Sequence, residues 1–498
     1  MKAFRSAPFF LVSLLAAWAA SAKKPNILFI LADDMGYGDA RALNAQSGIP
    51  TPNLDRLARE GMTFTDAHSP SAVCTPTRYG VITGRYCWRS RLKRGVLGGY
   101  SSPLIEKDRP TVGSVLQAAG YHTAAIGKWH LGMTMPQRKG SKVNNRWDGD
   151  GNVNFKGKIN DSPTARGFDE YFGVSASLDM APYVWIENDH FTKAPTIQYP
   201  GSGFPVFVRK GPQADDLKFE EALDVLAERA VGFLRRMAKP KKKTPFFLYL
   251  PLTGPHKPVV PHPRFQGKTK LGPYGDFVMN VDDCVGQVLE ALDELELSQG
   301  TLVIFTSDNG SFMYSKESDE DHLSNASMQS YDPAHHRANG ALRGTKADVW
   351  EAGHRVPFFA RWPGQVKAGS KTDKTICHVD LLATAAEVAG AKIPSGAAAD
   401  SYSFLPLLTG KEDNHQRPPV INHSAGGMFA IRDGKWKLVL GNGSGGRQSP
   451  KGKPFQRPYH LFDLEADLPE TNNLEAKETK VAQRLDKLFQ PIHQLEEK

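Results

Sequence analysis

Residues 71–84 read SAVCTPTRYGVITG and place a cysteine two residues before a proline and four residues before an arginine. A single cysteine has three chemical interpretations: a thiol nucleophile, a disulfide partner or a small buried hydrophobe. For an arbitrary cysteine the buried interpretation has the most weight. The fixed spacing of Pro76 and Arg78 from Cys74, together with ionisable residues elsewhere in the chain, favours a chemical role instead.

Four short apolar runs each lead into polar or ionisable side chains. The runs cover residues 26–31, 121–126, 245–252 and 301–306, and such runs are typical of strands buried on both faces. The residues that follow them are Asp33 and Asp34, Lys128 and His130, His256, and Asp308 and Asn309. Because ligand sites in doubly wound sheets form at the carboxyl ends of the strands, we expect these side chains to meet at one edge of a sheet.

The alternation of these strands with amphipathic segments indicates an α/β protein. Apolar residues recur at helical spacing in 51–60, 111–119, 219–237 and 277–297, and a further helix is expected from 77 to 84. The sequence therefore predicts a large, doubly wound, mostly parallel sheet with helices on both faces.

The sequence pattern changes after about residue 401. Residues 428–440 and 459–464 are typical of antiparallel strands, with a Gly/Ser-rich hairpin at 441–446 and an amphipathic helix at 476–495. We expect a smaller C-terminal α+β domain that carries an antiparallel sheet. The predicted organisation is a leader at 1–22, a large α/β domain at 23–400 and a C-terminal α+β subdomain at 401–498.

The first 22 residues are typical of a secretory signal peptide. Lys2 and Arg5 give a basic start, residues 9–20 are mostly apolar, and Ala20-Ser21-Ala22 is a small-residue cleavage site. The apolar run is too short to favour a membrane span, and no later run is long enough for one. We therefore expect cleavage after Ala22, a periplasmic or secreted protein, and no integral membrane span.

The net charge of the chain gives a weaker indication of its partners. The 498 residues carry a formal net charge of +9, which favours anionic partners such as sulfated glycans or nucleic acid. A role in solubility explains the same charge. Since the sequence contains no nucleic-acid-binding motif, we expect no nucleic-acid partner.

The run around Cys74 resembles the signature of the type I sulfatases, which is Cys-x-Pro-Ser/Thr-Arg followed by an apolar pair and Thr-Gly. The resemblance extends over nearly the whole chain after the leader and implies an alkaline-phosphatase-like α/β fold. In that family a maturation enzyme oxidises the cysteine to Cα-formylglycine, an aldehyde. The resemblance therefore implies that Cys74 becomes the nucleophile of a sulfuric ester hydrolase and that a formylglycine-generating enzyme is a partner.

The same resemblance assigns roles to the residues at the strand ends. It implies four metal ligands, all oxygen donors of the kind Ca²⁺ prefers, with Mg²⁺ as the alternative: Asp33, Asp34, Asp308 and Asn309. The residues that match those holding and activating the nucleophile are Arg78, Lys128 and His130. The residues that match those binding sulfate and serving the leaving oxygen are His256 and Lys346.

Substrate specificity is indicated by a less specific resemblance. Residues 87–91 and 179–189 resemble bacterial sulfatases that act on 6-sulfated galactose or N-acetylgalactosamine. We therefore expect a sulfated glycan substrate, with Asp179, Glu187 and Asn188 as candidates for binding sugar hydroxyls. Two alternatives stay open: a phosphonate or phosphate ester hydrolase of the same superfamily, and a secreted glycan-binding protein whose cysteine is not matured.

The remaining cysteines give little scope for disulfides. If Cys74 is consumed as the aldehyde, Cys87, Cys284 and Cys377 can form at most one disulfide. Cys284 lies in a helical apolar pattern, so we expect it in the core.

Overall fold

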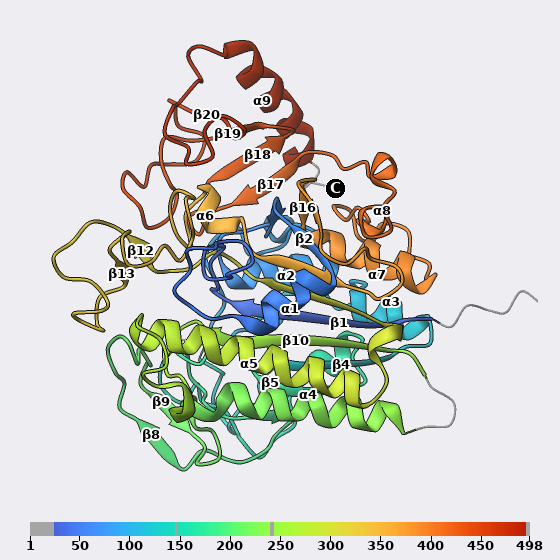
Figure 1. Ribbon diagram of the computed structural model, residues 1–498. Coiled ribbons are helices and arrows are strands. Elements are labelled where there is room, and N and C mark those ends of the chain that lie inside the picture. Colours follow the sequence, from blue (N-terminus) through green and yellow to red (C-terminus); the bar gives the residue numbers. More distant parts are fainter. Residues whose placement is uncertain (1–23, 145–146, 240–243, 495–498) are drawn as a thin grey trace, which may run out of the picture.

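The structure is a computed structural model that describes residues 24–144, 147–239 and 244–494 (Figure 1). The predicted leader at 1–22 lies outside the described residues. Within the described ranges, no helix combines the length and the apolar character that a membrane span requires.

A ten-stranded sheet forms the centre of the molecule, and it confirms the predicted α/β class. Its five central strands run parallel, in the spatial order β11 (Thr301–Ser307), β1 (Asn26–Asp33), β10 (Phe246–Pro255), β4 (His122–Lys128) and β5 (Glu170–Val174). Beyond β11 lie β14 (Phe358–Arg361), β2 (Met62–Phe64) and β15 (Ser370–Thr372), and beyond β5 lie β6 (Ile186–Glu187) and β7 (His190–Phe191). Strands β1, β10 and β11 are buried almost throughout, which explains their uninterrupted apolar sequences.

Helices cover both faces of this sheet (Figure 1). On one face α4 (Ala222–Ala238) and α5 (Gly272–Glu294) pack against β10, and α1 (Pro52–Glu60) packs against α5. The other face carries α2 (Cys74–Thr83), α3 (Val112–Ala118) and α7 (Leu381–Ala389). The doubly wound arrangement leaves the carboxyl ends of the parallel strands open to the loops that follow them.

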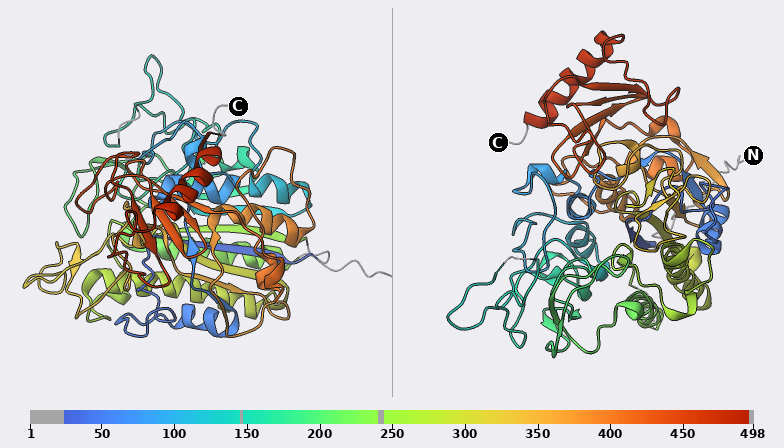
Figure 2. Two further views of the ribbon diagram at one scale, coloured as in Figure 1. Left: turned by 90° about the horizontal axis from the view of Figure 1, so that it is seen from above. Right: turned by 90° about the vertical axis from the view of Figure 1, so that its left-hand side faces the viewer.

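The C-terminal segment forms a second, antiparallel sheet. Its strands lie in the order β17 (Val420–His423), β18 (Phe429–Asp433), β19 (Trp436–Val439) and β20 (His460–Asp463), and α9 (Thr479–Gln494) packs on β18 and β19. Figures 1 and 2 show this sheet standing over the face that carries α2, away from α4 and α5. The smaller antiparallel unit predicted from the sequence is therefore confirmed.

Short elements complete the fold. Three two-stranded sheets pair β3 (Ala67–His68) with β16 (Ile376–Cys377), β8 (Ile197–Tyr199) with β9 (Gly211–Gln213), and β12 (Tyr314–Ser315) with β13 (Ser330–Tyr331) among the described residues. Two one-turn helices are α6 (Glu351–His354) and α8 (Leu405–Leu408).

The expected hairpin at 441–446 takes a different form. The tight turn of this sheet lies between β18 and β19, where Gly434 has a φ of +56°. Residues 441–446 belong to the long connection between β19 and β20 and press against the main domain. A Cβ on Gly446 would lie 2.3 Å from the carbonyl oxygen of Ala347, so this close approach requires glycine.

Candidate active site

Four neighbouring strands end side by side and bring together the polar groups predicted to meet. In the register of the sheet, Ala32 lies opposite Ser307 and Asp33 lies opposite Pro255. Asp308 directly follows β11, His256 directly follows β10, and Lys128 is the last residue of β4. All of these side chains are buried, so the structure builds a polar cluster inside the carboxyl edge of the sheet.

Cys74 lies beside this cluster, at the first residue of α2. Val73 is extended, with φ −144° and ψ 154°, so the helix begins three residues earlier than the sequence predicted. Pro76 fits within the first helical turn, where the missing N–H has no helical acceptor to lose. The Cys74 side chain therefore meets the positive end of a helix, while burial raises the pKa of its thiol.

Three buried cations each hold one of three buried carboxylates. Lys128 Nζ lies 2.6 Å from Asp33 Oδ2, and Lys346 Nζ lies 2.6 Å from Asp34 Oδ1. Arg78 Nη2 lies 2.7 Å from Asp308 Oδ2. Burial alone raises the pKa of a carboxyl, but Arg78, Lys128 and Lys346 together hold the pKa of Asp308 below its ordinary value.

The donor set at this cluster fits a divalent cation. Asp33 Oδ1 and Asn309 Oδ1 are buried and accept no hydrogen bond from the residues that the structure describes. Potential ligand atoms of Asp33, Cys74 and Asp308 lie within 4.8 Å of one another. Burial raises the pKa of Asp33 above its ordinary value despite the opposing charge of Lys128, and the neighbouring carboxylate of Asp308 adds to the rise. Carboxylate and amide oxygens with unfilled acceptor positions are the ligands that Ca²⁺ takes.

Two residues of the cluster have a backbone conformation that is unusual for residues other than glycine. Asp34 has a φ of +66° and His130 a φ of +59°. The left-handed region costs such residues about 1 kcal/mol or more and persists where surrounding structure imposes it, often at functional sites. The conformations that point Asp34 and His130 into the cluster therefore lower the stability of the fold.

In both His256 and His130, one ring nitrogen donates to a backbone carbonyl and the other makes no hydrogen bond to the backbone that the structure describes. His256 Nδ1 donates to the carbonyl oxygen of Lys257 at 2.6 Å, and its Nε2 lies 3.7 Å from Asp34 Oδ2. His130 Nε2 donates to the carbonyl oxygen of Leu97 at 2.7 Å, and its Nδ1 has no hydrogen-bond partner among the described residues. Burial, reinforced by Lys346 at His256 and by Lys128 at His130, holds both pKa values well below the ordinary one. Both rings are therefore neutral near pH 7.

A pocket of about 520 Å³ opens onto this cluster. Cys74, His256 and Lys346 line it together with Asp179. The other polar or aromatic residues of its wall are Trp147, Phe207, Arg209, Lys257 and Arg447, and Gly445 and Gly446 belong to the connection that reaches over from the C-terminal sheet. A sugar ring fits a cavity of this size.

Only one of the three predicted sugar-binding residues reaches the pocket. Asp179 lines it, with Oδ2 paired to Arg209 and Oδ1 buried without a hydrogen-bond partner among the described residues. Glu187 lies in β6 at the sheet edge and pairs with Arg229 at 3.1 Å. Asn188 lies in the turn between β6 and β7, where its Oδ1 accepts from the backbone N–H of Tyr171. The structure does not bring Glu187 and Asn188 to the pocket.

Most of the pocket wall was not predicted from the sequence. Only Lys257 could have been placed in the wall from the sequence, because it is adjacent to His256. Trp147, Arg209 and Arg447 come from loops far apart in the chain, and no local pattern marks them. Their convergence depends on tertiary packing alone.

On this fold, a buried cysteine at a helix start lies beside a cluster of buried carboxylates and cations. The family model described as sulfatase matches residues 25–391, and one described as N-sulphoglucosamine sulphohydrolase, C-terminal, matches residues 345–498. The chain belongs to the sulfatase family, and it is a sulfuric ester hydrolase.

Individual relatives agree with this assignment. The chain is 32% identical to an N-acetylgalactosamine-6-O-sulfatase of Bacteroides thetaiotaomicron, over 95% of this chain and 94% of that protein. It is 31% identical to human arylsulfatase A, over 94% of this chain and 87% of that protein. A solved structure from work on the metabolism of multiple glycosaminoglycans by Bacteroides thetaiotaomicron superposes with a TM-score of 0.80 at 30% identity. That match covers 95% of this chain and all of the other.

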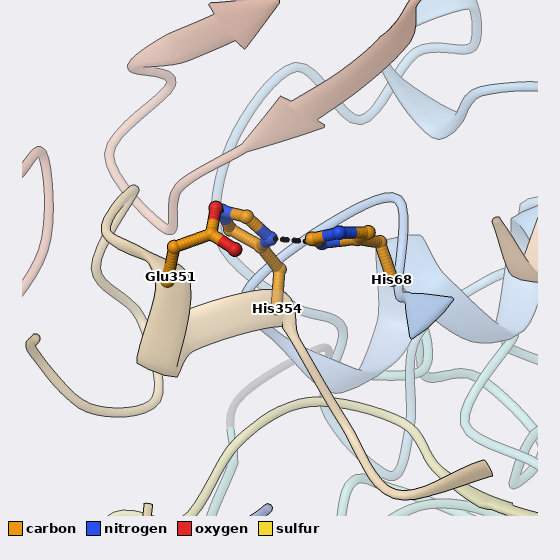
Figure 3. A group of neighbouring side chains, drawn as sticks. All are labelled: His68, Glu351 and His354. Carbon is orange, nitrogen blue, oxygen red and sulfur yellow. Dashed lines mark hydrogen bonds and ion pairs between the residues drawn. The ribbon is translucent and has the colours of Figure 1, made fainter. Parts of the chain in front are cut away.

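A second buried cluster joins the main domain to the C-terminal sheet. Figure 3 shows His68 of β3 facing His354 of α6, with their Nδ1 atoms 3.0 Å apart and Glu351 beside them. Lys437 of β19 already supplies a cation here, with Nζ 3.0 Å from Glu351 Oε1 and 2.8 Å from Glu470 Oε1. Because a protein cation fills this cluster, we interpret it as a structural contact between the two units.

Removing that cation should destabilise the protein strongly. Replacing Lys437 with methionine leaves Glu351 and Glu470 buried without their shared partner, so we expect the free energy of unfolding to fall by about 3–5 kcal/mol. Urea unfolding followed by tryptophan fluorescence measures the change. Lys435→Met, on the same hairpin but with a side chain that is 40% exposed, is the matched control and should leave the unfolding midpoint nearly unchanged. Equal midpoints for the two variants would show that the buried contact does not hold the units together.

All four cysteines lie in the described part of the chain, and all are free and buried. Cys284 packs in the core as expected, with its Sγ 3.5 Å from the carbonyl oxygen of Leu223.

Proposed function

We propose that this sulfatase removes sulfate from a sulfated carbohydrate, with 6-O-sulfated galactose or N-acetylgalactosamine as the best candidate. In this proposal the nucleophile is formylglycine made from Cys74, and the metal is Ca²⁺ held by Asp33, Asp34, Asp308 and Asn309. The observation that carries the proposal is the position of Cys74 at a helix start, in one pocket with Lys346 and His256. The N-acetylgalactosamine-6-O-sulfatase relative supports the choice of sugar.

The aldehyde allows the sulfated intermediate to release sulfate, a step that a thiol cannot complete. Its hydrate carries two hydroxyls on one carbon, so one can attack sulfur and the other can expel sulfate as the carbonyl re-forms. When bound, the metal would favour loss of a proton from the attacking hydroxyl and offset charge on the sulfate oxygens. The net reaction consumes one water and releases the alcohol, sulfate and a proton.

The side chains around Cys74 supply the remaining steps. Lys346 lines the pocket beside Cys74, while Arg78 and Lys128 complete the positive field behind it, which stabilises developing negative charge. His256 Nε2 is free of backbone partners, so it can carry a proton to the departing alcohol oxygen once the bound anion raises its proton affinity. His130 Nδ1 has no partner among the described residues and can accept the proton of the second hydroxyl.

Asp179 is the residue we propose to bind a sugar hydroxyl. Its Oδ2 is held by Arg209, which fixes the carboxylate, and its Oδ1 is left as an acceptor inside the pocket. The guanidinium of Arg209 lies 5.1 Å from the ring of Trp147, which steadies this pair.

Replacing Asp179 with alanine should separate sugar substrates from simple ones. A hydrogen bond to a charged group contributes about 1.5–3 kcal/mol, so kcat/KM on the 6-sulfated sugar should fall about 10- to 100-fold. For a small aryl sulfate, kcat/KM should change by less than about threefold, because this substrate has no sugar hydroxyl for Asp179 to bind. Glu187→Ala is the control, because this exposed residue lies outside the pocket and should leave both rates unchanged. Equal losses on both substrates would refute hydroxyl binding by Asp179.

We also propose that the protein is exported and matured. The leader at 1–22 directs it to the periplasm or the outside of the cell with cleavage after Ala22, and the division between main and C-terminal units falls near residue 400. A formylglycine-generating enzyme is the required partner. Determining the N-terminal sequence of the exported protein tests the cleavage site, which should leave Ala22 absent and Lys23 first.

A further inference from the structure

Two cations in the pocket wall take no part in the catalytic cluster. Lys257 follows His256 at the end of β10, and Arg447 lies in the connection between β19 and β20. Both line the pocket that also contains Cys74 and Lys346. They approach the pocket from separate parts of the chain, one from the main domain and one from the C-terminal segment.

Neither of these two cationic side chains forms an ion pair among the described residues, although Asp348 Oδ1 accepts the backbone N–H of Arg447. Among the described residues, no carboxylate lies within ion-pair distance of Lys257 or Arg447, and no group accepts a hydrogen bond from the Arg447 guanidinium. Lys257 Nζ donates to an uncharged amide, Gln329 Oε1, at 3.3 Å. The cations of the catalytic cluster differ, since each holds a carboxylate within 2.7 Å. Asp179, the acidic residue of this pocket wall, is already paired with Arg209.

The structure holds the Lys257 ammonium and the Arg447 backbone in place despite the repulsion between the two charges. Lys257 Nζ lies 5.1 Å and 5.3 Å from the ring centres of Phe207 and Phe312. Burial and the positive charge of Arg447 lower the pKa of Lys257 to about 8. The backbone at Arg447 is anchored by its N–H to Asp348 Oδ1 at 2.5 Å, next to Gly446, which has no room for a side chain. The ammonium of Lys257 is therefore restrained, and Arg447 extends from an anchored backbone.

Unpaired charges in a partly buried wall are unfavourable unless a ligand supplies the opposite charge. The sulfate that is cleaved lies at Cys74 and Lys346 in the proposed reaction, so it satisfies a different set of cations. We propose that Lys257 and Arg447 form a second anion subsite, so that the preferred substrate, given the proposed function, carries another anionic group beside the sulfate ester that is cleaved. That group is a second sulfate ester or a carboxylate, because both are compact oxyanions that bind arginine and lysine.

Binding measurements test the subsite independently of turnover. In a Cys74→Ala protein, isothermal titration calorimetry compares three sugars: N-acetylgalactosamine 6-sulfate, its 4,6-disulfate, and a uronate-containing disaccharide with the same 6-sulfate. We expect at least one doubly anionic sugar to bind about tenfold more tightly or better, since one charge-assisted hydrogen bond is worth that factor. The two doubly anionic sugars distinguish a sulfate from a carboxylate.

Adding Arg447→Gln should reduce this preference to within about threefold of unity, because the guanidinium charge is lost while the side chain keeps its approximate length. Lys451→Gln is the matched control, since it removes one exposed positive charge from the same connection and lies outside the pocket wall. This control should retain the full preference, and raised salt should weaken the preference in the Cys74→Ala protein.

Three results would overturn the subsite: equal affinities for all three sugars, a preference that Arg447→Gln leaves intact, or no measurable binding of any of them. Sulfate release by the unsubstituted protein is measured separately. A protein that binds with the expected preference but releases no sulfate would contradict the proposed function and leave the subsite standing. A protein that releases sulfate but shows no preference for the doubly anionic sugars would contradict the subsite and leave the proposed function standing.

Discussion

Replacing Cys74 with alanine should abolish sulfate release. We expect kcat to fall by about 10⁴-fold or more, because removing a covalent nucleophile leaves only binding and electrostatic stabilisation. Alanine is small enough to fit at this buried helix start without altering the neighbouring carboxylates and cations. Ion chromatography of inorganic sulfate, with a small aryl sulfate and a 6-sulfated sugar as substrates, measures the loss.

Cys284→Ala is the control for this substitution. Cys284 is also buried, but it lies in α5 and contacts the carbonyl oxygen of Leu223, far from the chemistry. This variant should keep kcat within about twofold of the unsubstituted protein, since small volume changes in a core mainly affect stability. If Cys74→Ala keeps appreciable activity while the control is fully active, Cys74 is not the nucleophile.

The second large effect concerns the carboxylates at the strand ends. Asp33→Asn keeps the shape of the side chain but removes its charge, so we expect kcat/KM to fall by about 10²–10³-fold. Removing divalent cations from the unsubstituted protein with a chelator should cause a loss of similar size, and added Ca²⁺ should restore the activity. The physical reason is that Asp33 Oδ1 and Asn309 Oδ1 are buried acceptors without donors among the described residues.

Thermal unfolding separates metal binding from catalysis. At Ca²⁺ concentrations about 100-fold above the dissociation constant, binding to the native state should stabilise the unsubstituted protein by about 2.7 kcal/mol. Asp33→Asn should lose most of that stabilisation. Asp215→Asn, an exposed aspartate paired with Lys193, should retain both the stabilisation and the activity. A chelated protein with full activity and an unchanged melting temperature would refute the metal site.

The parts of the structure that the sequence predicted are those set by local patterns. Strands β1, β10 and β11 are buried on both faces, so their sequences are apolar without interruption, and their ends are marked where the first charged residue appears. In a parallel sheet those ends share one edge, and for this reason Asp33, His256 and Asp308 could be expected together.

The parts that the sequence did not predict depend on contacts between distant segments. Asp179 and Glu187 are close in the chain, but β6 runs antiparallel to β5 and carries Glu187 back along the sheet edge. Arg447 reaches the pocket because Gly446 lets its connection pack closely on Ala347 of the main domain, while Gly445 packs against Met428 and Ser424 of the C-terminal sheet. No periodicity or local spacing encodes either outcome.

The mass of the tryptic peptide that contains residue 74 shows whether Cys74 has become formylglycine. Trypsin should release Glu60–Arg78 from the protein isolated from the cells that naturally make it. If Cys74 becomes formylglycine, this peptide is about 18 Da lighter than its thiol form, because the sulfur and two hydrogens are replaced by one carbonyl oxygen. An active preparation whose peptide carries only the unmodified cysteine would contradict the account.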